Sequence, residues 1–241
     1  MWATSGYSAV TMDTAGTAAD RAAESRARAA RTKRDRTRAA LLSAADPAFA
    51  ARGWARTRVE DIASAAGVSS ATAYNHFPTK HVLIAQVYAP LLRNLRTQAY
   101  RDITTGRPSV PALTDHLRAL VRISWRHRGL TAALSAGIAD YAVRVRRPAD
   151  PGDENDPRVL APVGDVLVEL IARGQSSGEL RPWPPAEEIG TMLVDLLLVR
   201  AVGRPHDPPE LTAELMLTFL FGALRPELLA DADPDTRPFR G

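Results

Sequence analysis

The sequence has no cysteine and no long apolar run. Without cysteine the chain can form neither a disulfide bond nor a thiolate metal site. No window approaches the run of about 18 apolar residues that a membrane-spanning helix requires. The first ten residues also lack the basic start and the apolar stretch of a secretory signal. We therefore expect a cytoplasmic protein that does not contact a membrane.

Patterns that bind cofactors or carry catalysis are missing as well. Neither type of glycine-rich nucleotide-binding loop is present, and no cofactor is expected. The histidines outside the segment described below have no metal-ligand spacing, either among themselves or with the acidic residues of the C-terminal half. We expect no catalytic residues, and an all-helical enzyme is the weakest of the functional classes that we consider.

Large apolar residues are scarce in the first 30 residues, which are mainly Ala, Thr, Ser and Arg. Such a segment buries too little surface to offset the entropy of ordering, so residues 1–30 are expected to be mostly disordered. The alanine-rich stretch near Arg31 could extend the first helix backwards.

Positive charge is concentrated in residues 20–38, where eight basic residues oppose three acidic ones. This segment has a net charge of +5, whereas the whole chain has +4. A basic end on a nearly neutral body is typical of a nucleic-acid-binding protein, although a solvated tail without a partner is the alternative. The arm could add minor-groove contacts through Arg31, Lys33 or Arg34.

From Asp35 onwards the apolar residues follow a helical period, and no useful stretch alternates as a β-strand would. Leu41, Ala45 and Phe49 define the buried face of a first helix, which Pro47 is expected to bend or break. An all-α fold is therefore expected.

Residues 57–80 have the pattern of a helix-turn-helix. Thr57 and Glu60 have the spacing of a capping box at the start of a short helix. Gly67 supplies the left-handed conformation of a sharp turn. Ser69 is expected to cap the second helix, whose first turn could then lie in the major groove of DNA.

This segment closely resembles the DNA-binding domain of the TetR family of repressors. The residues that match in order and spacing are Ile62-Ala63, Ala66-Gly67-Val68-Ser69, Ala71-Thr72-Ala73-Tyr74-Asn75-His76-Phe77 and Lys80. The detailed match extends over roughly residues 36–95. It departs from the family at Ala73, where a larger residue is usual, so the core of the motif is expected to be thinner.

The resemblance implies DNA contacts along this segment. The recognition helix would face base edges, and Tyr74 and His76 would bind phosphates. Lys80 would bind a phosphate from the first turn of the following helix, where the backbone N–H groups also attract anions. The start of the preceding helix would reach the DNA backbone or a neighbouring base. The expected DNA-contacting residues are Thr57, Arg58, Ser69, Ser70, Ala71, Thr72, Tyr74, Asn75, His76 and Lys80.

The resemblance also implies four parts of the chain. Residues 1–30 form a disordered basic arm, and residues 31–82 form a three-helix DNA-binding domain. Residues 83–228 form a helical domain for effector binding and dimerisation, and residues 229–241 form a flexible tail.

Five further helices are predicted in the C-terminal part. They are Pro111–Arg126, Leu130–Arg146, Arg158–Ser176, Pro185–Val202 and Pro208–Leu224. The last two are apolar on more than one side and must be buried on more than one side. In the TetR family such a pair packs against its symmetry mate as a four-helix bundle, whereas a core position within one subunit is the alternative. The expected homodimer contacts are Leu193, Leu196, Leu197, Leu215, Phe219 and Leu220.

A small-molecule effector is a further implication of the resemblance. Aromatic and polar residues of two middle helices could line its pocket, although the aromatic ones could equally belong to the core. The candidate effector-binding residues are Trp125, His127, Asp140, Tyr141 and Arg144.

The sequence thus predicts a sequence-specific transcriptional regulator that binds a pseudo-palindromic operator in double-stranded DNA as a homodimer. The expected mode is a repressor that a small-molecule effector releases. A non-specific or architectural DNA-binding protein without an effector is the alternative. A TetR fold that has lost DNA binding is disfavoured because Tyr74, His76 and Lys80 are present.

Overall fold

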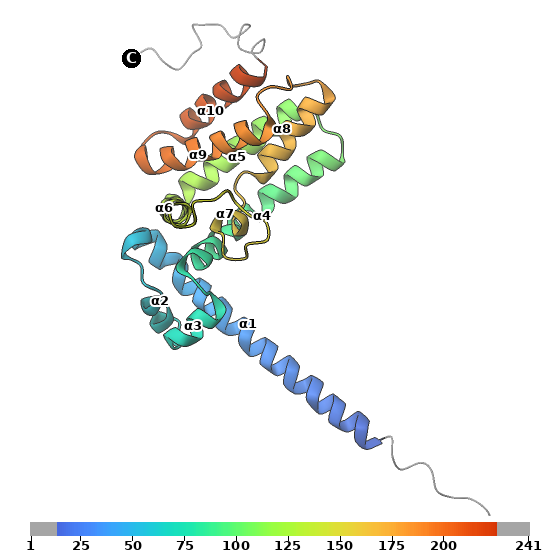
Figure 1. Cartoon of the computed structure of the whole chain (residues 1–241), viewed down its shortest axis with the longest axis vertical. Helices are drawn as coiled ribbons and strands as arrows, with labels where there is room; N and C mark the ends of the chain where they lie inside the picture. Colours follow the sequence, from blue (N-terminus) through green and yellow to red (C-terminus); the bar gives the residue numbers. More distant parts are fainter. Residues whose placement is uncertain (1–13, 226–241) are drawn as a thin grey trace, which may run out of the picture.

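The computed structural model describes residues 14–225, with side chains from residue 20 onwards, and its regular elements over this range are ten helices. They are α1 Thr14–Arg56, α2 Val59–Ala65, α3 Ser70–His76, α4 Lys80–Thr104, α5 Ser109–Arg126, α6 Arg128–Val145, α7 Pro157–Leu160, α8 Asp165–Ser177, α9 Ala186–Gly203 and α10 Pro209–Leu224. The predicted all-α class is confirmed. Figure 1 shows the larger helical part at one end, α2 and α3 beside α1, and α1 projecting far beyond α2 and α3 on the side away from the larger part.

Helix α1 is longer and more continuous than the sequence predicted. Residues 14–30 are helical instead of disordered, because alanine and arginine are strong helix formers even where no core is available. The helix also passes through Pro47, and its non-helical residue is Gly53, at φ 69°. Leu41, Ala45 and Phe49 are fully buried on both sides of the proline. Their packing compensates for the hydrogen bond that the proline removes.

Helices α2 and α3 pack on α1 around a small apolar core. Ile62, Ala73 and Phe77 are almost completely buried within it. Gly67 has the predicted left-handed conformation, with φ 70°. The predicted capping box is absent: α2 has Arg58 as its N-cap residue, without a side-chain hydrogen bond. The Thr57 hydroxyl instead donates to the carbonyl oxygen of Gly53, 2.7 Å away.

Helices α4 and α6 join the part of the molecule that contains α1, α2 and α3 to the larger helical part. Helix α4 runs without interruption across the predicted domain boundary at residues 82 and 83. Helix α6 crosses α1 so closely that a Cβ atom at Gly129 would overlap the carbonyl oxygen of Ala50. At the start of α4, His81 forms a 2.7 Å contact with Asp140 of α6. Helices α4 and α6 therefore hold α1 and the start of α4 against the larger part.

The larger part is built around α5, which packs against α4, α8 and α10. The predicted helix over residues 158–176 is divided into α7 and α8. Pro162 lies between them, and a proline disfavours helical geometry in the residue before it. The predicted helices in residues 111–126, 130–146, 185–202 and 208–224 are present, and their ends differ from the predicted ones by at most two residues.

No helix in residues 14–225 combines the length and the hydropathy of a membrane span. The predicted tail at residues 229–241 and the first 13 residues of the predicted arm lie outside the described residues.

Candidate DNA-binding surface and effector cleft

Helix α3 is capped at its start and exposed along one side. The Ser69 hydroxyl accepts a hydrogen bond from the backbone N–H of Thr72 at 3.2 Å, which confirms the predicted cap. Ala71 and Asn75 are exposed one helical turn apart, while Ala73 is buried against the core. The side chain of Asn75 makes no hydrogen bond within the described residues, so its amide is free to bind another molecule.

Tyr74 lies beside this exposed side but already has a partner. Its hydroxyl donates to a carboxylate oxygen of Glu60 on α2, 2.9 Å away. This hydrogen bond raises the pKa of Tyr74. The pKa of Glu60 is lowered by its own backbone N–H and by the tyrosine hydroxyl. Tyr74 must leave the Glu60 carboxylate before it can donate to a phosphate.

His76 lies at the end of α3, next to basic residues of α1. Burial lowers the pKa of His76, and the charges of Arg34 and Arg38 lower it further. The imidazole is therefore neutral near pH 7, and one ring N–H can donate to a phosphate oxygen. The guanidinium of Arg38 lies 4.8 Å from the centre of the Phe77 ring and also donates to Gln86 at 3.0 Å.

Two of the predicted DNA contacts have hydrogen-bond partners within the fold. Thr57 is 1% exposed and its hydroxyl binds backbone carbonyls, so it cannot reach DNA in this conformation. The ammonium of Lys80 donates to the carbonyl oxygens of Trp54 and Thr57, at 2.7 and 3.1 Å. It also lies 4.1 Å from the centre of a Trp54 ring. Lys80 thus holds the corner between α1 and α2.

The predicted dimer contacts divide into two groups. Leu193, Leu197 and Leu220 are fully buried within one chain and belong to its core, which corrects the prediction for these three. Leu196 and Leu215 are partly exposed, and Phe219 is 39% exposed. The most exposed apolar residues of α9 were not predicted, because a helix that is apolar on all sides does not reveal which side faces its own core. These residues are Met192, Val199 and Val202.

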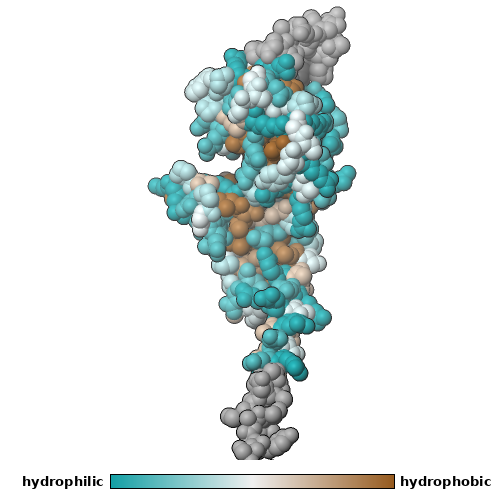
Figure 2. All heavy atoms as spheres, turned by 90° about the vertical axis from the view of Figure 1, so that its right-hand side faces the viewer, coloured by the Kyte–Doolittle hydropathy of each residue, from teal (hydrophilic) through white to brown (hydrophobic). Residues whose placement is uncertain are grey.

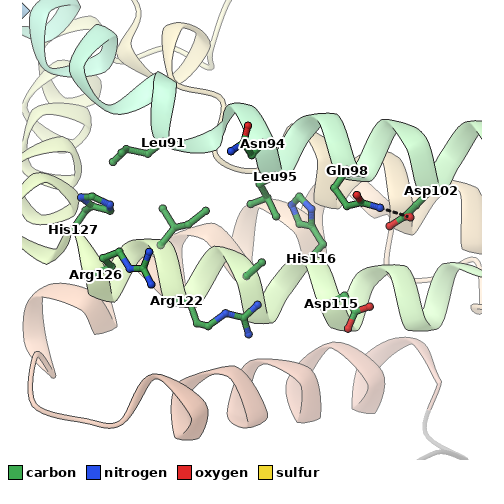
Figure 3. A pocket seen from close by; sticks show the side chains of 13 residues that line it. Leu91, Asn94, Leu95, Gln98, Asp102, Asp115, His116, Arg122, Arg126 and His127 are labelled. Atoms are coloured by element: carbon green, nitrogen blue, oxygen red, sulfur yellow. Dashed lines mark hydrogen bonds between the residues drawn. The ribbon is translucent and has the colours of Figure 1, made fainter.

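A cleft of about 520 Å³ lies between α4 and α5. Its apolar lining includes Leu91, Leu95 and Ile123. Figure 3 shows Arg126 and His127 at one end of this cleft and Asp102 and Asp115 at the other. The volume is within the range of small-molecule pockets, which is roughly 300–1,000 Å³.

Polar groups without protein partners face this cleft. His116 is 5% exposed and makes no hydrogen bond within the described residues. Burial lowers its pKa to about 4, so the imidazole is neutral near pH 7. Arg122 and Arg126, one turn apart on α5, form no ion pair in the part of the chain that the structure describes. In contrast, Arg107 bridges the two acidic residues at the other end.

Of the candidate effector residues, only His127 lines this cleft. Trp125 donates its indole N–H to the carbonyl oxygen of Asp207, 2.8 Å away. Asp140 pairs with His81 and Arg144 beside the helix-turn-helix. Tyr141 is buried and its hydroxyl donates to Asp153 at 2.6 Å. These four residues therefore lie outside this cleft and have partners within the chain. The i, i+4 pair Arg122 and Arg126 was the signal in the sequence that could have indicated the cleft.

The family model of bacterial regulatory proteins of the tetR family matches residues 41–87. Among curated proteins, the chain is similar to the HTH-type transcriptional repressor Rv3405c of Mycobacterium tuberculosis, with 37% identity over 95 residues. That alignment covers 38% of this chain and 48% of the repressor. The chain thus spans about half the length of the curated relatives that it matches.

Solved structures match over a larger share of the chain. FadR of Thermus thermophilus, a TetR family transcriptional repressor in complex with lauroyl-CoA, has 26% identity and a TM-score of 0.62. This match covers 85% of our chain and 99% of FadR. FadR of Bacillus subtilis, in complex with stearoyl-CoA, shares the fold at 16% identity and a TM-score of 0.56, over 75% of our chain and 96% of its own. From the helix-turn-helix, the family model and these relatives together, we conclude that residues 41–87 form a DNA-binding segment of the TetR type, and that the chain is similar in fold to TetR family regulators over most of its length.

Proposed function

We propose that this protein is a transcriptional repressor that binds a pseudo-palindromic operator as a homodimer and is released by an anionic, amphipathic effector. It would act in the cytoplasm, where a bacterial chromosome is located, and it would act by binding and not by catalysis. The observation that carries the proposal is the helix-turn-helix, which presents an exposed side of α3 beside a basic helix.

The exposed side of α3 has the chemistry of a DNA reader. Asn75 carries an unpaired amide, and an asparagine amide can form two hydrogen bonds with adenine in the major groove. Ser70 and Thr72 provide short hydroxyls near the start of the same helix. Arg58, which is exposed at the start of α2, is placed to reach a phosphate beside the reading helix.

Replacing Asn75 by Ala should reduce preference for the operator while leaving binding to random-sequence DNA unchanged. Losing one good base contact costs about 1–3 kcal/mol of discrimination, or roughly 5- to 150-fold. The operator is first selected from a random-sequence library with the full chain, and anisotropy competition then gives both affinities. Ser64→Ala, on an exposed position of α2, is the control.

The same competition separates the repressor from a non-specific binder. A regulator should prefer its selected site over random DNA by about 10³-fold or more. Equal affinity for both would favour the architectural alternative.

An unpartnered apolar surface on α9 and α10 supports the homodimer. Met192, Val199 and Val202 expose half or more of their surface on α9, and Phe219 is 39% exposed on α10, which packs against α9. The other sides of α9 pack on α6 and α8. Burying this apolar surface against a second copy gives a two-fold dimer. Two recognition helices would then read half-sites about one turn of DNA, roughly 34–36 Å, apart.

The cleft between α4 and α5 supports an effector with an apolar chain and an anionic group. Apolar residues line its middle, and the unpaired guanidinium groups of Arg122 and Arg126 attract an anion to the part of the cleft farther from Asp102. The neutral imidazole of His116 can donate one hydrogen bond to a carbonyl group within the cleft. A fatty acyl-CoA combines all three features, and it is the ligand class that occupies the FadR relatives.

Helix α4 provides the path from this cleft to DNA. Its first residue binds the α1–α2 corner, and its second half lines the cleft. An effector releases the operator only if it binds more tightly to the state that cannot bind DNA. A ten-fold loss of operator affinity requires a coupling of about 1.4 kcal/mol.

The double variant Arg122→Gln/Arg126→Gln should require at least about ten-fold more lauroyl-CoA to release the operator, because two charge-assisted contacts with the anionic group are lost. Release is measured by anisotropy of labelled operator, with free coenzyme A and laurate as separate arms. Arg118→Gln is the control, because Arg118 lies on the same helix but pairs with Glu214. If the same lauroyl-CoA concentration releases the operator from the double variant and from the unsubstituted protein, the anionic group does not bind Arg122 and Arg126.

A further inference from the structure

The first half of α1 is a free-standing basic helix. All side chains from Asp20 to Arg36 are exposed, and the first fully buried residue of α1 is Leu41. At about 1.5 Å per residue, residues 20–36 extend about 25 Å from the body. Figure 1 shows this part of α1 continuing past α3, and Figure 2 shows its surface as mainly hydrophilic.

The basic residues of this helix are concentrated on one side. At about 100° per residue, five of them fall within one half of the helix circumference, which contains no acidic residue. They are Arg21, Arg26, Arg28, Lys33 and Arg36. The acidic residues Asp20, Glu24 and Asp35 lie on the opposite half. None of the five forms an ion pair within the described residues, so their charge is not neutralised by the protein.

The end of this projecting segment that joins the body of the protein lies directly beside the recognition helix α3. Arg34 and Arg38 are close enough to His76, at the end of α3, for their charges to lower its pKa. Arg38 also stacks on Phe77, which follows α3. DNA that is bound by α3 therefore has the base of the projecting helix next to it.

The composition of the helix favours a polyanion as its partner. A helix that binds a membrane surface needs large apolar residues on one side, but here the uncharged residues between the basic ones are only Ala, Ser and Thr. A helix without tertiary contacts is also only marginally stable in water, and neutralising its positive charges would stabilise it. Duplex DNA carries one negative charge per about 1.7 Å along its axis, which is dense enough to engage all five residues.

We propose that residues 20–38 of α1 are a second DNA-binding element, which contacts phosphates flanking the bases that α3 reads. A helix is about 10–12 Å wide, so it fits the major groove of about 12 Å but not the minor groove of about 6 Å. The contact therefore follows the phosphates along a major groove instead of entering the minor groove, as Arg31, Lys33 or Arg34 in a flexible arm would. The 25 Å length corresponds to about seven base pairs on each side of the operator.

The inference rests on the proposed DNA binding, and the test separates the two. The five residues are replaced by Gln, which keeps the helix propensity, and helicity is checked by circular dichroism. Operator affinity is measured by anisotropy between 50 and 300 mM salt. Each lost phosphate contact lowers the slope of log K against log salt by about 0.9. We expect the slope to fall by about 3 or more per dimer, with at least ten-fold weaker binding at low salt.

The control variant replaces five exposed arginines of the body by Gln, which gives the same change in net charge. These residues are Arg93, Arg101, Arg128, Arg146 and Arg204. This variant should keep the full slope. The variant with the five Gln substitutions in α1 is called the arm variant. Trimming the operator to its selected core should weaken binding by the unsubstituted chain but not by the arm variant. Hydroxyl-radical footprints of the arm variant should also lack protection of the DNA that flanks this core.

If the arm variant has an unchanged salt slope and an unchanged footprint, residues 20–38 are not a DNA-binding element. This outcome would leave the proposed repressor function unaffected. Absence of operator binding by the full chain would instead overturn the proposed function. Vesicles that contain phosphatidylserine form a third arm. Binding to them that depends on the five residues, together with an unchanged DNA slope, would assign the helix to a membrane surface and contradict the proposal.

Discussion

A Val199→Asp variant should be monomeric and should lose nearly all operator affinity. Val199 is 66% exposed in one chain, so a carboxylate there is hydrated and the fold of the monomer is preserved. In the proposed two-fold dimer the same carboxylate would be buried twice against apolar residues of α9 and α10. An unpaired buried charge costs several kcal/mol, so we expect dimer dissociation to become about 10²- to 10³-fold easier or more.

Sedimentation velocity gives the oligomeric state, and anisotropy of labelled operator gives the binding. Val143→Asp is the matched control because Val143 is equally exposed, at 70%, but lies on α6, away from the proposed interface. The control should remain dimeric with full operator affinity. A Val199→Asp protein that stays dimeric would exclude this face as the interface, and the homodimer would then need a different surface.

A Lys80→Met variant should unfold more easily and bind the operator more weakly at every salt concentration. The ammonium donates hydrogen bonds to the backbone carbonyls of Trp54 and Thr57 and lies over the Trp54 ring. A hydrogen bond to a charged group contributes about 1.5–3 kcal/mol, and partial exposure of Lys80 reduces the total. We expect the free energy of unfolding to fall by roughly 2–3 kcal/mol. The slope of log K against log salt should not change, because no phosphate contact is removed.

The role that the TetR family resemblance implies for Lys80 predicts a different result for the Lys80→Met variant. If Lys80 binds a phosphate, stability should be nearly unchanged and the slope should fall by about 0.9 per protomer. Lys33→Met is the reference, since Lys33 is exposed on the projecting helix and lacks an ion pair. Urea denaturation and salt titration of the two variants therefore decide whether Lys80 acts on the fold or on DNA.

The helix-turn-helix was predictable because its determinants are local. Gly67 and Ser69 specify the turn and the cap by short-range backbone geometry, and both have the predicted conformations. Most predicted helices of the C-terminal part are also present, because apolar periodicity depends only on neighbouring residues. Pro47 shows the limit of a local rule, since burial of Leu41 and Phe49 keeps the helix continuous there.

Residue roles were less predictable because they depend on which groups meet in space. Lys80 binds residues that are distant from it in the sequence. Its hydrogen-bond partners Trp54 and Thr57 precede it by 26 and 23 residues. Leu197 and Val199 are two residues apart on one apolar helix, yet one is fully buried and the other is exposed. The cleft similarly depends on the distance between α4 and α5, and the sequence pattern of one helix does not specify its distance from another.

The sequence by itself determined the helical class, the turn and cap of the DNA-binding motif, and the concentration of positive charge before it. These follow from backbone preferences and charges that each segment carries alone. The tertiary structure decided that Thr57 is buried, that Lys80 binds the corner between α1 and α2, and which side of α9 is open. Packing between distant segments sets burial and the partner of each polar group, and both are absent from a linear pattern.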